Sequence, residues 1–364
     1  MTSAPIERVA ARAFRLATED GPESDGTAVW DATTMVLAEV RAGGVTGIGY
    51  SYVDRSAATA IASLLAPAIT GQDAFSIPAA RAAMLRAIRN HGRPGVVACA
   101  ISAVDVALWD LKAKLLGVAL ADLLGAARVG VPVYASGGFT SSGPERLARE
   151  LDGYRAAGHR RVKIKVGRTP AGDIERVRVA RDAVGTGIEL MVDANGAYER
   201  KQALAMAEAF AALGVCYFEE PVSSDDLEGL RLVRDRAPAG MAIAAGEYGY
   251  DGWYFRRMLA AGAVDILQAD ATRALGVSGF LQADALCAAR SMPLSSHCAP
   301  AIHAHAGASA AQLVHLEYFR DHVRMEAMLF EGVPAVADGV ATVDRSRPGL
   351  GLQLREDAAG SLQI

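Results

Sequence analysis

Short apolar runs alternate with amphipathic segments through the middle of the chain, between about residue 130 and residue 320. The apolar runs are rich in Val, Ile and Leu, which is typical of buried β-strands. The segments between them, such as residues 144–158 and 171–185, place apolar residues three and four positions apart, as amphipathic helices do. The alternation predicts a series of parallel βαβ units.

The N-terminal part of the chain follows other patterns. Residues 33–52 alternate apolar and polar positions and are interrupted by a Gly-Gly pair, which predicts a hairpin. Residues 96–117 have helical spacing that stops at Gly117. An α+β unit therefore precedes the alternating region.

The chain divides into three predicted parts. The α+β domain covers residues 1–127, and the alternating region covers residues 128–325. Residues 326–364 return to strand and turn character, and we expect this segment to pack back on the first domain.

Charged residues stand at the ends of the apolar runs, at intervals of roughly 20 to 28 residues, close to the length of a βα unit in a (β/α)8 barrel. The series consists of Lys165, Asp193, Glu219, Glu247, Asp270, His297 and Glu317. Catalytic groups of such barrels sit at the C-terminal ends of the strands. The spacing therefore predicts an α/β barrel enzyme.

Composition excludes several other classes of protein. The chain has 364 residues, of which 51% are hydrophobic and 21% charged, so it can bury a large core. Its net charge of −4 comes from mixed acidic and basic residues, which predicts neither nucleic-acid nor membrane binding. The cysteines form no CxxC pair and the N-terminal segment lacks a signal-peptide core, so we expect a cytoplasmic protein.

Two lysines lie two positions apart in one strand. Lys163 and Lys165 must share a face, while Val162, Ile164 and Val166 take the other face. In a barrel the lysines point inward; the alternative is an exposed edge strand with solvated lysines. Repulsion between two ammonium groups should lower their pKa values, so one could act as a general base while the other pairs with an anionic substrate.

Three acids end three successive strands. Asp193, Glu219 and Glu247 would repel one another in one barrel mouth unless a cation lies between them. Oxygen ligands of this kind suit Mg²⁺. The alternative is three unrelated surface acids. Glu220 faces away from Glu219 and is expected to support the site, and Pro221 should end the strand.

The next strands supply a carboxylate and an imidazole. Asp270 beside His297 would fix the tautomer of the ring and prepare it for proton transfer, although an isolated histidine is usually a core residue. Glu317 could donate a hydrogen bond to a substrate oxygen if protonated, or form an ordinary salt bridge. We expect core roles for the remaining histidines, which are His91, His159, His303, His305, His315 and His322.

These groups together suit one reaction. A lysine, a His–Asp pair and a divalent cation could remove the weakly acidic proton next to a carboxylate and hold the resulting charge. In these residues the chain resembles the enolase superfamily, and within it the mandelate racemase subgroup. The resemblance rests on SAVDVALWDLKAKLLG, KIK, VDAN, FEEP, GE, the acid ending VDILQAD, SSH and HLE.

The resemblance implies a fold and a set of residue roles. The fold would be a modified TIM barrel, (β/α)7β, with an N-terminal α+β capping domain that the C-terminal tail completes. Lys163 would contact the substrate carboxylate, and Lys165 would be the base for one face. The remaining matches are the Mg²⁺ ligands Asp193, Glu219 and Glu247, the opposite-face dyad of Asp270 and His297, the carboxylate-binding Glu317, and Asn195 near the α-hydroxyl.

Departures from relatives narrow the activity. Muconate-lactonizing and dipeptide-epimerase relatives carry a lysine on the sixth strand and usually Asp as the third ligand. This chain has Glu247 as the third ligand and no lysine on the sixth strand. Arg273 cannot replace that lysine as a base, because guanidinium stays protonated. Muconate lactonization and dipeptide epimerization are therefore disfavoured.

The reaction and substrate stay open at this stage. Reprotonation on the other face would make a racemase or epimerase, and loss of a β-hydroxyl would make an acid-sugar dehydratase, which we favour. A sugar-lactone cycloisomerase and a non-catalytic barrel that only binds are the alternatives. Trp30, Tyr52 and Arg55 in the capping loops favour a polyhydroxy acid over an aryl acid, unless these residues are merely solvated. The resemblance also implies a homo-oligomer, an octamer or a dimer.

Overall fold

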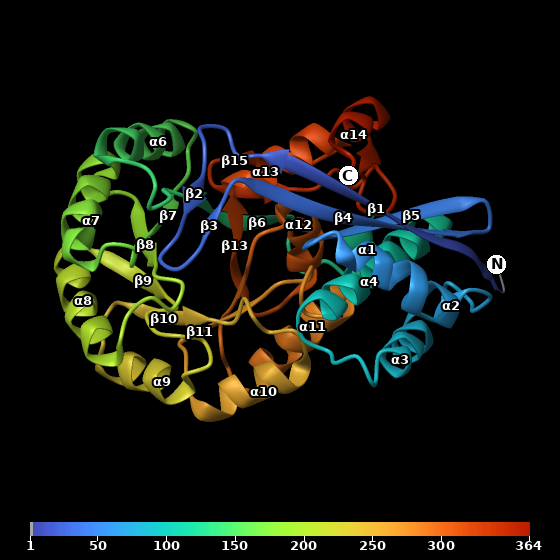
Figure 1. The fold of residues 1–364 in the computed structure, drawn as a ribbon, viewed down its shortest axis with the longest axis horizontal. Coiled ribbons are helices and arrows are strands. Elements are labelled where there is room, and N and C mark those ends of the chain that lie inside the picture. Colours follow the sequence, from blue (N-terminus) through green and yellow to red (C-terminus); the bar gives the residue numbers. More distant parts are fainter. Residues whose placement is uncertain (1–2) are drawn as a thin grey trace.

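A closed barrel of eight parallel strands forms the centre of the computed structural model, which describes residues 3–364 (Figure 1). Each strand pairs with the next along the chain, and β13 pairs with β6 to close the barrel. The strands are β6 (Gly130–Gly137), β7 (Arg161–Lys165), β8 (Glu189–Asp193), β9 (Val215–Glu219), β10 (Ala242–Ala245), β11 (Ile266–Ala269), β12 (Leu294–Ser296) and β13 (Leu313–Phe319).

Seven helices connect these strands and surround the barrel, which gives the (β/α)7β order (Figure 1). Side-chain caps start some of them: Asp226 accepts a hydrogen bond from Gly229 N before α9, and Asp251 accepts one from Tyr254 N before α10. The helices are α6 (Pro144–Ala156), α7 (Pro170–Val184), α8 (Arg200–Ala212), α9 (Leu227–Arg236), α10 (Gly252–Ala261), α11 (Gly276–Ala288) and α12 (Pro300–Ser309).

The capping domain packs an antiparallel sheet against helices. The order of the sheet is β1-β4-β5, and the long helix α4 lies against β5 and ends at Gly117, as the sequence predicts. Its elements are β1 (Ile6–Ala17), β2 (Glu23–Ser24), β3 (Val29–Trp30), β4 (Ala32–Ala42), β5 (Val45–Tyr52), α1 (Ser56–Ala60), the π-helical turn η1 (Ile61–Leu65), α2 (Ala66–Ile69), α3 (Ile77–Ala87), α4 (Val96–Leu116) and α5 (Leu120–Leu124).

The C-terminal segment divides its contacts between the two domains. Strand β16 pairs antiparallel with the start of β6, so one part of the segment extends the barrel sheet. The other part returns to the capping sheet, where Ile364 N donates a hydrogen bond to Ala13 O at 2.9 Å. Its elements are α13 (Arg320–Leu329), β14 (Phe330–Glu331), β15 (Ala335–Ala337), β16 (Val340–Thr342), β17 (Gln353–Leu354) and α14 (Glu356–Leu362).

Contacts between the capping domain and the barrel hold a loop over the C-terminal ends of the strands. The segment containing β2 and β3 lies across the barrel in Figure 1, and Thr140 N donates to Ser24 O at 2.7 Å. On the other side, Asp105 of α4 accepts hydrogen bonds from the backbone and hydroxyl of Ser278 in α11. The loop that could cover a substrate is therefore anchored to the barrel.

Crossing a membrane takes a helix that is both long and predominantly apolar. Within residues 3–364, no helix combines sufficient length with sufficient apolar character.

Candidate active site

The charged residues at the strand ends converge at the C-terminal mouth of the barrel. Strands β7, β8 and β9 are in a register that places Lys165, Asp193 and Glu219 side by side. All members of the set are buried, although they are charged or ionisable. The set comprises Lys163, Lys165, Asp193, Glu219, Glu247, Asp270, His297 and Glu317.

Asp193, Glu219 and Glu247 form a buried cluster of carboxylates. One oxygen from each lies within 4.8 Å of the others, and Glu247 Oε2 has no hydrogen-bond partner among the described residues. Burial and the neighbouring Asp193 raise the pKa of Glu219 well above its ordinary value. Three hard oxygen donors at this spacing fit Mg²⁺, which would relieve their repulsion.

Glu220 lies just after the end of β9 with a positive φ of 38°, and its buried Oε1 has no hydrogen-bond partner among the described residues. Burial and the charge of Glu247 raise its pKa well above the ordinary value. Strand β9 ends at Glu219, before Pro221, as the sequence indicates.

Gly246 sets the position of Glu247. Its φ is 141°, and an added Cβ would meet Gln268 O at 2.1 Å. Gly246→Ala should therefore strain the backbone by about 1–3 kcal/mol and displace Glu247. Urea unfolding and Mg²⁺ titration would measure both effects. Gly187→Ala is the control, because nothing lies within 4 Å of its added Cβ; equal losses in the two variants would contradict the argument.

The two lysines point into the barrel and pair with carboxylates. Lys163 Nζ lies 2.8 Å from Glu219 Oε2 and from Glu317 Oε1, and Lys165 Nζ lies 2.5 Å from Asp193 Oδ2. Burial lowers the lysine pKa values, but the carboxylates outweigh it, and both values lie above the ordinary one. The expected lowering by mutual repulsion is therefore wrong for this arrangement, because the sequence did not show how many anions surround each ammonium group.

Asp270 forms a hydrogen bond with the Nδ1 side of the His297 ring. Nδ1 of the ring lies 2.9 Å from Asp270 Oδ2. The other carboxylate oxygen, Asp270 Oδ1, accepts a hydrogen bond from Thr272 N at 2.7 Å. Burial would raise the pKa of Asp270, but the hydrogen bond and charge of His297 lower it below its ordinary value. Since an ionised carboxylate can only accept, Nδ1 carries a proton and Nε2 faces the barrel mouth.

Glu317 joins the lysine and histidine sides of the site. Its Oε1 pairs with Lys163, and its Oε2 accepts a hydrogen bond from Cys298 N at 2.9 Å. Burial opposes the charge of Glu317, but Lys163 and the neighbouring cations hold its pKa well below the ordinary value. In this arrangement Glu317 is an acceptor, so the expected role as a protonated donor is not supported.

Both domains of the chain match models of known protein families. Residues 146–358 match a family model described as enolase C-terminal domain-like. Residues 17–125 match the N-terminal domain of mandelate racemase and muconate lactonizing enzyme. The chain belongs to the enolase superfamily. Like its relatives, this superfamily member is a magnesium-dependent lyase or isomerase.

Individual relatives match this chain over almost its whole length. The L-talarate/galactarate dehydratase of Salmonella typhimurium is 33% identical over 91% of this chain and 83% of its own. A mandelate racemase/muconate lactonizing enzyme-like protein from Rubrobacter xylanophilus has a TM-score of 0.96 and 54% identity, covering 99% of this chain and 100% of its own. A racemase from Streptomyces coelicolor with bound magnesium has a TM-score of 0.92 and 31% identity, with coverages of 99% and 100%.

A cavity of about 450 Å³ opens over the site of this superfamily member. Lys165, Glu247, His297 and Glu317 line its inner end. The lining also includes three of the residues that the sequence suggested for substrate contact: Asn195 just after β8, and Trp30 and Tyr52 on the side of the capping domain, the outer end of the cavity.

Arg55 does not take the predicted place. It is exposed at the start of α1 and is not among the residues that line the cavity. Its position at the N-cap of α1 leaves its side chain exposed, so the structure does not place Arg55 against a substrate in the cavity.

Tyr52 lines the cavity, and its hydroxyl is hydrogen-bonded within the protein. The ring stacks on His322 with centroids 3.3 Å apart, and the hydroxyl donates to Glu326 Oε1 at 3.3 Å. Glu326 also accepts a hydrogen bond from Tyr50 at 2.6 Å, so both tyrosines end at one buried carboxyl group.

This carboxyl group should make stability depend on pH. Burial raises the pKa of Glu326 from 4.5 to about 8, so between these values the folded state binds a proton that the unfolded state releases. The free energy of unfolding should therefore fall by about 1.4 kcal/mol per pH unit as the pH rises from 4.5 to about 8. Urea unfolding of Glu326→Gln should lack this component, whereas the exposed control Glu331→Gln should keep it. Identical pH profiles for Glu326→Gln and the unsubstituted protein would refute it.

Sequence reasoning assigned no role in the site to three cavity residues that contact the predicted site residues, which are Arg273, Cys298 and His322. Arg273 donates to Glu247 Oε1 at 3.3 Å and lies 3.8 Å from Asp270 Oδ2, so it bridges the metal cluster and the dyad. Cys298 follows His297 directly, and this adjacency was the available signal. His322 was expected in the core, and no spacing in the sequence indicates its stacking on Tyr52.

Proposed function

We propose that the protein is an acid-sugar dehydratase whose substrate is an aldonate, a polyhydroxy monocarboxylic acid. One observation carries the proposal: Lys165 on β7 and the His297–Asp270 pair after β11 and β12 flank a cluster of carboxylates at the ends of β8, β9 and β10. Two proton-transfer groups on either side of a cation site suit removal of an α-proton and expulsion of a β-hydroxyl.

Asp193, Glu219 and Glu247 would hold the Mg²⁺ ion. When bound, it would supply positive charge that stabilises the negative charge developing on the substrate carboxylate. Lys163 would contribute a second positive charge, held in place by Glu317 at 2.8 Å. These residues orient the carboxylate so that its α-carbon faces the two proton-transfer groups.

The proton transfers belong to Lys165 and His297. With Mg²⁺ held by Asp193, the anion that raises the pKa of Lys165 would be neutralised, and burial together with Lys163 would favour the uncharged amine. Lys165 would then accept the α-proton as the enediolate forms, and His297, protonated on Nε2, would donate a proton as the bond between the β-carbon and its hydroxyl breaks. The hydroxyl leaves as water, and the resulting enol becomes a 2-keto-3-deoxy acid. Asp270 keeps Nδ1 protonated and stabilises the charged ring throughout.

The outer end of the cavity favours a substrate tail without charge. Asp25, Asp54 and Asp321 line it, and Asp321 Oδ1 is buried without a partner among the described residues. The cations that line this cavity, Lys165 and Arg273, are both engaged at the inner end by Asp193 and Glu247. A second carboxylate would meet like charge there, whereas hydroxyl groups could donate to Asp321.

A substrate panel tests the function. Aldonates and aldarates are incubated with Mg²⁺ in D₂O and followed by mass spectrometry and NMR. Loss of water from an aldonate supports the proposal, and turnover of aldarates alone would overturn the substrate class. Deuterium exchange without elimination would indicate an epimerase, and ring opening of a lactone would indicate a cycloisomerase. Absence of exchange with any compound would indicate a binding protein.

The cytoplasmic location and the homo-oligomer stay predictions.

A further inference from the structure

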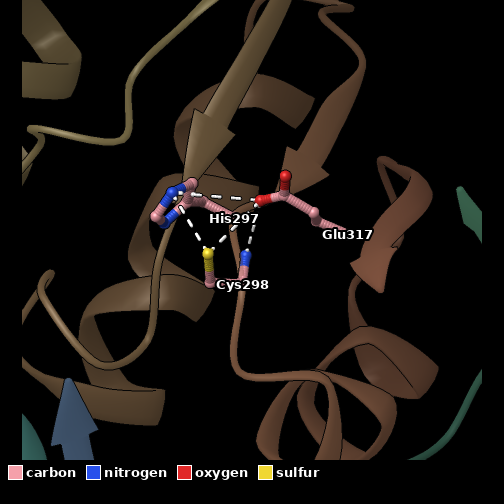
Figure 2. Close-up of side chains that lie close together, drawn as sticks. All are labelled: His297, Cys298 and Glu317. Atoms are coloured by element: carbon pink, nitrogen blue, oxygen red, sulfur yellow. Dashed lines mark hydrogen bonds and ion pairs between the residues drawn. The ribbon is translucent and has the colours of Figure 1, made fainter. Parts of the chain in front are cut away.

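Three donor atoms of different chemistry meet beside the carboxylate cluster. Figure 2 shows His297 and Cys298, which follow β12, and Glu317 of β13 turned toward one another. The distances are 3.3 Å from Cys298 Sγ to His297 Nε2, 3.5 Å from Sγ to Glu317 Oε2, and 3.9 Å from Nε2 to Oε2. All three side chains are buried.

These separations are close to those around a tetrahedral zinc ion. With zinc–sulfur bonds of about 2.3 Å and zinc–nitrogen and zinc–oxygen bonds of about 2.0–2.1 Å, neighbouring donors lie roughly 3.3–3.6 Å apart. The two separations that involve Cys298 Sγ lie within about 0.3 Å of the value of roughly 3.5–3.6 Å for a sulfur pair, and the nitrogen–oxygen separation must close by about 0.5–0.6 Å. A fourth position would remain for water or substrate.

The surroundings orient the donors for a metal. Asp270 binds Nδ1 of His297 at 2.9 Å and leaves Nε2 for a metal, with the thiol at 3.3 Å and Glu247 Oε2 at 3.4 Å. A carboxylate on Nδ1 is the carboxylate–histidine–metal arrangement of zinc proteins. Cys298 has φ of 53°, a left-handed conformation that is uncommon for a non-glycine residue. Its Sγ thereby lies between the ring and Glu317.

We propose that His297, Cys298 and Glu317 form a second metal site, which binds Zn²⁺ or a similar thiophilic cation and inhibits the enzyme. A thiolate selects Zn²⁺ over Mg²⁺, whereas the all-oxygen cluster of Asp193, Glu219 and Glu247 suits Mg²⁺. The inhibitory part rests on the proposed function, because the ion would occupy Nε2 of His297, which the dehydration requires as a proton donor.

Cobalt is the first probe, because its bond to a thiolate gives a charge-transfer band in the near ultraviolet. Protein saturated with Mg²⁺ is titrated with Co²⁺, and we expect the band in the native chain and in Cys216→Ser. Cys298→Ser and Cys298→Ala should both lack it. A native protein without the band, or a band that persists in both Cys298 variants, would overturn the site.

Zinc binding is then measured by calorimetry in excess Mg²⁺. Cys298→Ser should weaken Zn²⁺ binding at least 10-fold, because a metal ligand is lost, while Mg²⁺ binding by the carboxylates stays within a few-fold of native. Retained Mg²⁺ binding and an unchanged circular dichroism spectrum show that each variant is folded. Equal Zn²⁺ affinity in native and variant proteins would place the ion elsewhere.

Inhibition is tested separately from binding. Zn²⁺ should lower turnover of the substrate that the panel identifies, and its inhibition constant should match the calorimetric Kd. Tight binding of Zn²⁺ without inhibition would refute the inhibitory role and leave the site intact. If no substrate is turned over at all, the proposed function fails, but the cobalt and calorimetric results still decide the site.

Discussion

Lys165→Met and His297→Asn should each lower dehydration by about 10²–10⁴-fold, the usual contribution of a general acid or base. Both side chains line the inner end of the cavity, next to the carboxylates that would hold the metal. Their roles differ, so their effects on exchange should differ. His297→Asn should still exchange the α-proton with D₂O, because Lys165 remains, whereas Lys165→Met should not.

Exposed Lys201, changed to methionine, is the matched control and should keep native turnover. Stopped assays with NMR would measure elimination and exchange in the same sample. Exchange that survives in Lys165→Met and disappears in His297→Asn would reverse the assignment of base and acid. Near-native turnover in both variants would refute the proposed chemistry.

Loss of a metal ligand should have the second largest effect. Asp193→Asn and Glu219→Gln each remove one charge from the cluster whose oxygens lie within 4.8 Å, so Mg²⁺ affinity should fall and turnover should become undetectable. Chelation of the native enzyme should do the same, and added Mg²⁺ should restore activity.

Mg²⁺ binding should also stabilise the folded protein. At a Mg²⁺ concentration of 100 times its Kd, the free energy of unfolding of the native protein should rise by about 2.7 kcal/mol, and this rise should vanish in both ligand variants. Thermal unfolding with and without Mg²⁺ measures it. Glu208→Gln on the exposed face of α8 is the control and should respond as the native protein does. An undiminished response in Asp193→Asn would exclude that residue as a ligand.

The fold was predictable because its signals are periodic. Strand residues alternate between two faces, so the pattern of β7 placed Lys163 and Lys165 together and Val162 and Ile164 against the helices. Parallel strands in one barrel end at one mouth, which brought residues far apart in sequence to one place. The pairing of β16 with β6 was not foreseen, because a short antiparallel strand carries little pattern of its own.

The electrostatics of the site were not predictable to the same degree. The pKa of a lysine depends on every charge within a few ångströms, and Glu219 and Glu317 reach Lys163 from other strands. Two neighbouring lysines in a sequence show their repulsion but not these partners. The same limit hid Arg273, which contacts Glu247 across the barrel mouth.

The sequence by itself determined the barrel, its capping domain and the types of side chain that end each strand, because alternation and spacing are local properties of the chain. Only the tertiary structure decided that Arg55 points outward, that Tyr52 gives its hydroxyl to Glu326, and that Cys298 meets His297 and Glu317. Loop conformations and contacts between strands set these positions, and both depend on residues distant in sequence.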